Sequence, residues 1–102
     1  MLKFTQIDDE VQVFHNDSQD PVWKHGILRH TDEAQTHTLE LQGGANKLEV
    51  KAFNDIGSAS LFGSITYSYA DRTETHVWED NAGHHVPRRP EPFEHYVHEF
   101  QH

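Results

Sequence analysis

Apolar and polar residues alternate along most of this chain, which is the pattern of strands that bury one face. The longest run covers residues 46–52, where Leu48, Val50 and Ala52 share one face and lysine or glutamate residues occupy the other. One buried face and one solvated face are typical of an antiparallel sheet. The same alternation predicts strands at residues 2–4, 11–14, 37–41, 59–69 and 75–78, and a short or irregular one around 22–28.

Glycine and short polar residues separate these runs. Residues 16–21 (NDSQDP) have side chains that hydrogen-bond to the nearby backbone, which predicts a loop. Gly43-Gly44 has the positive-φ freedom of a tight turn and predicts a hairpin between the strands on either side. Asn54–Gly57 predicts another turn. Two further breaks are a bulge at Gly63 and a turn over residues 80–83.

The C-terminal segment fits two elements. Three prolines predict an extended connector over residues 86–92. After it, Phe93, Tyr96, Val97 and Phe100 have helical spacing, whereas Tyr96, His98 and Phe100 also alternate as in a strand. A strand is favoured over a short helix, because every earlier element is β. We therefore expect a sandwich core over residues 1–85, with residues 86–102 forming the connector and closing element of the same domain.

Seven or eight short strands without helical segments between them predict an all-β fold, an antiparallel two-sheet β-sandwich of immunoglobulin-like or jelly-roll type. A length of 102 residues suits one domain with one modest core. A parallel α/β fold is not expected, because it requires helices between the strands.

Charge narrows the classes of partner. Acidic residues outnumber basic ones 17 to 8, for a formal charge of −9. This balance argues against nucleic acid and anionic lipid surfaces, which attract basic proteins. No apolar run approaches the ~20 residues of a spanning helix, so membrane insertion is not expected. The N-terminus lacks the apolar stretch of a signal peptide, and we expect a soluble protein whose compartment stays open.

The segment Thr38–Tyr69 resembles the closing strands of bacterial immunoglobulin-like and galactose-binding-like sandwich modules. Such modules carry a leucine strand, a G-x-N turn and then an alternating strand that ends in an N/D-x-x-G turn. The resemblance covers about a third of the chain and implies a sandwich. The matching positions are Leu39, Leu41, Gly44, Asn46, Leu48, Val50, Ala52, Asn54 and Gly57.

A second segment, Trp78–Gly83, resembles the W-D-N-N-x-G turn of starch- and glycogen-binding modules. The resemblance implies that Trp78 and Asn81 contact a glucan. Glu79 and Asp80 stand where that family has Asp and Asn. Both resemblances include many noncatalytic sugar binders.

Candidate ligand-binding residues follow from aromatic and polar chemistry. Tryptophan and tyrosine rings stack on sugar rings, and amide or carboxylate groups bond to hydroxyls. Tyr67 and Tyr69 share a face with Ile65, so we expect them in the core. Replacing Trp78 with Ala is expected to abolish glycan binding without unfolding the domain. The candidate ligand-binding residues are Trp78, Asn81, Trp23 and Asp80.

Metal binding has two sets of candidate ligands. Imidazole and carboxylate suit a divalent transition metal, and loop carboxylates suit calcium. Neither set matches a strong motif, so no cofactor is expected, and these two ions are the alternatives. There are no cysteines, which excludes thiolate ligands and disulfides. The histidine candidates are His84, His85, His95 and His98, and the acidic candidates are Asp8, Asp9, Asp17 and Asp20.

Three functions follow, in order of preference. The first is a noncatalytic recognition module that binds carbohydrate. The second is a protein-interaction or assembly module, such as an accessory or virion-surface domain, that associates through exposed edge strands and can form oligomers. The third is a metal-dependent small β-barrel enzyme. Catalysis is not expected, since the chain has no G-x-S-x-G, P-loop or H-E-x-x-H motif.

Overall fold

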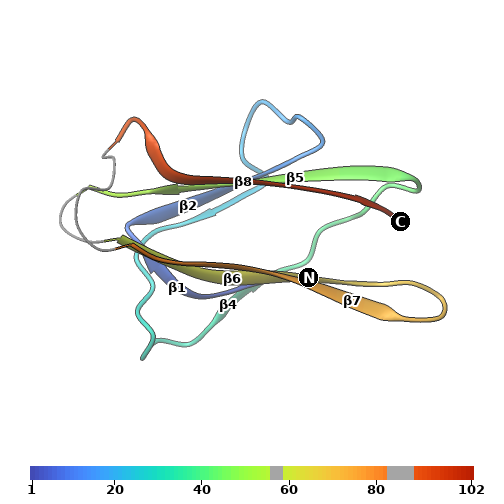
Figure 1. Cartoon of the computed structure of the whole chain (residues 1–102), viewed down its shortest axis with the longest axis horizontal. Coiled ribbons are helices and arrows are strands. Elements are labelled where there is room, and N and C mark those ends of the chain that lie inside the picture. Colours follow the sequence, from blue (N-terminus) through green and yellow to red (C-terminus); the bar gives the residue numbers. More distant parts are fainter. Residues whose placement is uncertain (56–58, 83–88) are drawn as a thin grey trace.

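The computed structural model describes residues 1–55, 59–82 and 89–102, and every regular element within them is a β-strand. The strands form two antiparallel sheets of four, stacked as two layers (Figure 1), which confirms the predicted all-β sandwich. The described residues include no helix long and apolar enough for a transmembrane span. One sheet has the order β4-β1-β6-β7, formed by Gln35–His37, Leu2–Asp8, Ala59–Ser68 and Thr73–Ala82. The other has the order β3-β2-β5-β8, formed by Trp23–His25, Glu10–His15, Ala45–Phe53 and Pro92–Gln101.

The core lies between the two sheets and follows the predicted alternation. Leu48, Val50 and Ala52 of β5 are at most 1% exposed. Phe4 of β1 is fully buried, and its ring stacks on Trp23 at 5.2 Å and on Trp78 at 6.3 Å between centroids. Each buried side chain of this size contributes about 1.5–3 kcal/mol, so these faces fix which side of each strand points inward.

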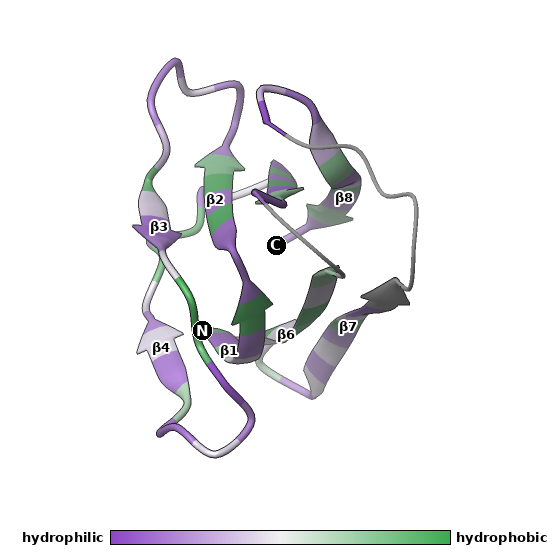
Figure 2. Ribbon diagram, turned by 90° about the vertical axis from the view of Figure 1, so that its left-hand side faces the viewer, coloured by the Kyte–Doolittle hydropathy of each residue, from purple (hydrophilic) through white to green (hydrophobic). Residues whose placement is uncertain are grey.

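The edge strands on the two sides of the sandwich differ in length. On one side the edge strands β3 and β4 have three residues each. On the opposite side the edge strands β7 and β8 have ten residues each, and Figure 2 shows these pairs on opposite sides of the molecule. Very short edges offer little backbone for pairing with another chain, whereas long edges remain templates for it.

The expected hairpin around Gly43-Gly44 is wrong. Strand β4 ends at His37, and β4 and β5 lie in different sheets. The glycine pair therefore lies in a connection from one layer to the other, with Gly44 at a φ of 90°. Leu39 and Leu41 still pack against the core without strand pairing, so their alternation indicated the buried face but not the partner.

Two further expected breaks are also corrected. The β1–β6 pair does have an irregularity at Gly63, but the extra residue lies on β1, between Phe4 opposite Gly63 and Gln6 opposite Phe62. Gly63 instead makes room for a neighbour, since a Cβ there would lie 2.4 Å from the Phe4 ring. Strand β7 continues through Ala82, so residues 80–82 extend the strand where a turn was expected. Gly83 lies outside the described residues.

The C-terminal segment is a strand, as favoured from its alternation. Strand β8 pairs with the whole of β5, from Ala45 opposite Gln101 to Phe53 opposite Pro92. Its buried residues Phe93 and Phe100 join the core. Residues 89–102 therefore belong to the same sandwich as the preceding strands, while the connector residues 86–88 lie outside the described part.

Candidate functional site

Polar side chains line the inner faces of β7 and β8, where the two long edge strands face each other. On β7, His76 and Asp80 are half-buried while Thr75, Val77 and Glu79 between and beside them are exposed. Alternate residues of β8 are likewise less exposed than their neighbours, so one residue in two on each strand points toward the opposite sheet. We call these residues the β7–β8 seam: Glu74, His76, Trp78 and Asp80 of β7, and Glu94, Tyr96, His98 and Phe100 of β8.

Two histidines meet at the middle of the seam. The rings of His76 and His98 stack at 4.1 Å with an interplanar angle of 12°. Burial, and then the charge of His76, lower the pKa of His98. Tyr67 donates a hydrogen bond of 3.2 Å to Glu74, and its hydroxyl also lies 3.5 Å from Nε2 of His98. The seam therefore favours a neutral His98, and the two sheets contact there through ring faces.

Two carboxyl groups meet further along the seam. Glu94 and Asp80 are hydrogen-bonded to each other, and this bond, together with burial and the charge of Asp80, raises the pKa of Glu94. Burial and the same two charges raise the pKa of Tyr96 to about 12, and its hydroxyl donates to the Glu79 carbonyl at 3.4 Å. Two carboxyl groups in direct contact leave no space for a sugar ring between them, so this pair lacks the separation of a glycosidase.

An open cleft of about 530 Å³ lies against the seam. It is lined by His76, Val77, Trp78, Glu79 and Tyr96. Trp78 is 2% exposed, and its indole N–H has no hydrogen-bond partner among the described residues. Buried tryptophan N–H groups usually have a partner, so this inaccessible donor is an exception in the core beside the cleft.

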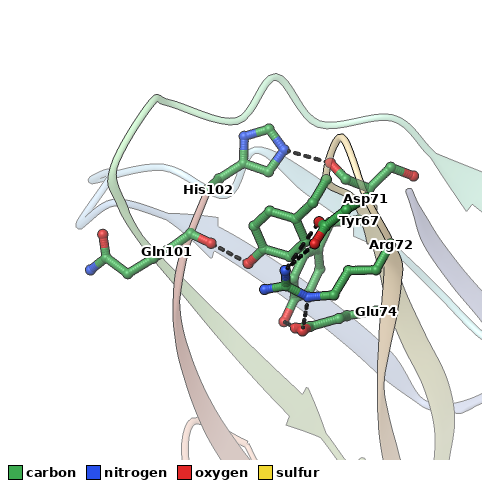
Figure 3. A network of polar contacts seen from close by, with 8 residues as sticks. Tyr67, Asp71, Arg72, Glu74, Gln101 and His102 are labelled. Atoms are coloured by element: carbon green, nitrogen blue, oxygen red, sulfur yellow. Dashed lines mark hydrogen bonds and ion pairs between the residues drawn. The ribbon is translucent and has the colours of Figure 1, made fainter.

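A polar network fastens the far end of the seam (Figure 3). Arg72 donates to Glu74 at 2.9 Å and lies over the ring of Tyr69 at 4.1 Å. Tyr69 donates to the carbonyl of Gln101, and His102 contacts the Ser68 carbonyl at 3.0 Å. These contacts join the β6–β7 hairpin to the end of β8, and so they hold the two sheets together at this end.

The candidate ligand-binding residues are not gathered at one surface. Trp78 lies in the core between Phe4 and His76, and rings of Phe4, His25 and His37 stack on Trp23. Trp23 is half-buried on β3, at the opposite side of the sandwich from Trp78. Asp80 points into the seam against Glu94, and the side chain of Asn81 lies outside the described residues.

Replacing Trp78 with a small residue is therefore expected to destabilise the fold. Truncating a buried aromatic residue costs about 3–5 kcal/mol. The expectation that Trp78→Ala leaves the fold intact is not supported by this burial, and Tyr96, which is half-buried and lines the cleft, is a better position for a test.

The histidine candidates for a metal site are separated. His95 lies on the outer face of β8, where its Nε2 is 2.8 Å from Oε2 of Glu49, whereas His98 lies on the inner face. His84 and His85 lie outside the described residues. Within the described ranges no group of three histidine, aspartate or glutamate side chains is placed to hold a metal ion.

The acidic candidates also fall into separate places. Asp8 and Asp9 join β1 to β2, and Asp17 and Asp20 follow β2, which is six residues or about 20 Å long. Oδ2 of Asp9 accepts a hydrogen bond of 2.6 Å from the Asp55 amide. Asp17 pairs with Lys47 at 2.9 Å and lines a second cleft of about 390 Å³ on β5 and β8.

Sequence reasoning missed His76 and Glu74, and considered Glu94 only as a possible metal ligand beside the C-terminal histidines. The signal for them was present, because Glu74, His76 and Trp78 alternate in the same register, and so do Glu94, Tyr96 and His98. Charged residues in the inward register are unusual in a core and indicate strands that lie at an edge. Comparison of the chain with known protein families, curated proteins and solved structures finds no match.

Proposed function

We propose that this sandwich is a protein-interaction or assembly module that associates through its β7–β8 side. The observation that supports this most is the contrast between the two open sides, with three-residue edges at β3 and β4 and ten-residue edges at β7 and β8. An edge strand adds a partner strand through backbone hydrogen bonds, and alternate side chains give specificity.

The side chains of these edges suit such pairing. Val77 and Val97 lie near the middle of their strands, and each is 53% exposed. Strand β7 contains no proline or lysine, and the proline of β8 is its first residue. The inward-facing charges of the seam disfavour unselective pairing, because a flat apolar edge would pair with many strands. The arrangement therefore favours a selective partner over aggregation.

Site-specific photo-crosslinking tests this function. A photoreactive residue is placed at Val77 or at Val97, with Lys3 on the outer face of the interior strand β1 as the control position. Crosslinks to protein are expected at the edge positions and not at Lys3. Adding the purified partner should then protect backbone amides of β7 or β8 from hydrogen exchange. Protection confined to other strands or loops, or no crosslink at either edge, would contradict the proposal.

Carbohydrate recognition remains a second candidate, which the open cleft beside the half-buried His76 and Tyr96 favours. A cleft with an aromatic wall and a few polar groups suits a sugar, and the imidazole of His76 and the hydroxyl of Tyr96 can bond to sugar hydroxyls there. Affinity electrophoresis against soluble polysaccharides tests it, with Tyr96→Ala as the variant. Val97→Ala, on the other face of β8, is the control. Retardation that Tyr96→Ala abolishes and Val97→Ala keeps would support binding in the cleft, whereas equal mobility of all three would count against it.

A further inference from the structure

We propose that β8 pairs antiparallel with β8 of a second copy of this chain, about a two-fold axis at Val97. The pairing joins two four-stranded sheets into one sheet of eight strands, with the two β8 strands at its centre. This inference rests on the proposed function, because it names the partner of the same side of the sandwich.

The outer face of β8 is self-complementary about Val97. Antiparallel pairing sets His95 opposite Glu99 of the second copy, and the two-fold axis makes this contact twice. His95 uses Nε2 for Glu49, and its Nδ1 has no hydrogen-bond partner in the described part of the chain. Glu99 is exposed and forms no ion pair with any described residue. Each chain thus sets an unused carboxylate beside an unused ring nitrogen of the other, and an imidazolium donates from both nitrogens, to Glu49 of its own chain and to Glu99 of the second copy.

The axis itself sets the two Val97 side chains against each other. Val97 is 53% exposed in the single chain, although it lies in the middle of a ten-residue strand. Directly opposed β-branched residues pack well across antiparallel strands. Pairing therefore removes an exposed apolar side chain from water in both copies.

The inner face of β8 also tolerates the pairing. The same axis sets Tyr96 opposite His98 and Glu94 opposite Phe100 of the second copy. No like charges are directly opposed. Tyr96 and His98 can share a hydrogen bond. The Glu94–Phe100 pair places a carboxyl group beside an aromatic ring.

The other long edge does not share this property. The corresponding axis at Val77 of β7 would set Glu74 opposite Asp80 of the second copy, and would do so twice. Like charges directly opposite each other destabilise a pair of strands. Self-association is therefore assigned to β8 and not to β7, although Val77 and Val97 are equally exposed.

Sedimentation equilibrium of the full chain over a concentration series provides the first test. The wild type and Val77→Lys are expected to dimerise. Val97→Lys is expected to weaken the dimer by about 100-fold or more, since it opposes two like charges at the axis. In the single chain residue 97 is opposite Glu49, which favours a lysine there, so the variant is expected to fold.

A cysteine crosslink gives an independent test, because the chain contains no other cysteine. Residues directly opposite each other across antiparallel strands have Cβ atoms about 4.5–5.5 Å apart, close enough for a disulfide after a small adjustment. With oxidised glutathione, Val97→Cys should form a covalent dimer much faster than Val77→Cys.

Several results would overturn the inference. In sedimentation, these are a wild type that stays monomeric at every concentration, or a dimer that is lost in Val77→Lys and retained in Val97→Lys. In crosslinking, it is an equal rate of dimer formation by the two cysteine variants. Failure of the inference is distinguishable from failure of the proposed function. A monomeric chain whose edge positions still crosslink to a different protein keeps the function and removes the second copy as the partner.

Discussion

At the scale of single residues, the tightest packing in the core is around Phe4. Its ring stacks on both Trp23 and Trp78 and lies over the backbone of Gly63. The ring is fully buried and stacked on two tryptophan rings, so moving it would disturb both contacts. Gly63 is therefore required for space and not for backbone conformation.

We expect Gly63→Ala to lower the free energy of unfolding by about 1–3 kcal/mol, the usual cost of an overpacked core. The added Cβ would lie 2.4 and 2.5 Å from two carbons of the Phe4 ring and 3.2 Å from the Lys3 carbonyl oxygen. Urea unfolding measures the change. Gly26→Ala is the matched control, since nothing lies within 4 Å of its Cβ, and its effect should stay within ~0.5 kcal/mol. Equal stability of the two variants would show that the Phe4 ring can move aside.

A buried amide shows how a single polar side chain holds the start of a strand. Asn46 is 2% exposed at the second residue of β5. Its Oδ1 accepts from the Gln42 amide at 3.1 Å and lies 2.9 Å from Nε2 of His15. Its Nδ2 donates to the carbonyls of Gln42 at 2.8 Å and Gly44 at 3.2 Å. The amide thus closes the chain crossing from one sheet to the other.

Asn46→Ala should cost about 1–3 kcal/mol in unfolding free energy, because it removes all the hydrogen bonds of a buried amide to the Gln42 and Gly44 backbone and to His15. Asn46→Asp should cost a similar amount, since a carboxylate keeps the acceptors but cannot donate to the two carbonyls. Chemical denaturation of both variants checks this. Wild-type stability in either one would mean that water replaces the amide at this turn.

At the scale of elements, Asp8 at the end of β1 makes the stability of the fold depend on pH. Burial, then a hydrogen bond that protonated Asp8 donates to Asp9 and the charge of Asp9, raise the pKa of Asp8 to about 6, from 3.8 in the unfolded chain. The folded state therefore binds the proton more tightly. This contribution to stability is fully present below pH 3.8 and is lost as the pH rises through about 6.

Asp8→Asn should accordingly be more stable than the wild type at pH 7, by less than ~1 kcal/mol because the site is partly solvated. The difference should vanish near pH ~4, where Asp8 is protonated in the folded chain. Thermal melts across this pH range measure it. Asp20→Asn in the exposed loop is the control for loss of one negative charge. A difference that stays constant with pH would assign the effect to something other than this titration.

For the individual strands, the sequence predicted which face is buried better than it predicted which strand pairs with which. Alternation identified the buried sides of β1, β2, β5 and β6, because burial imposes a period of two on each strand by itself. It could not say that β4 and β5 belong to different sheets, since a glycine turn suits a hairpin and a crossing equally well. The seam was missed for the same reason, because His76 and His98 become neighbours only once β7 and β8 are known to face each other.

At the scale of the whole molecule, β8 closes the sandwich. It pairs with all of β5 although about 40 residues or more separate the two strands in sequence. Phe100 stacks on Tyr67 of the opposite sheet at 4.3 Å, and Phe93 completes the other end of the core. Arg89, just before β8, is bound to Glu10 and Asp55, so the segment is fastened at both ends. The strand is thus part of the folding unit as well as the edge that we propose for association.

Deletion of residues 89–102 should therefore abolish cooperative unfolding, because it uncovers the full length of β5 and removes two core phenylalanines. Thermal melts followed by circular dichroism measure this. A synthetic peptide of residues 89–102 should restore the cooperative melt in trans, since the open edge of β5 can then accept the missing strand. A peptide with Phe93 and Phe100 both changed to Ser is the matched control and should not restore it. If the truncated chain instead melts as the full chain does, β8 is an appendage of the sandwich, and its edge can exchange partners without unfolding the remainder.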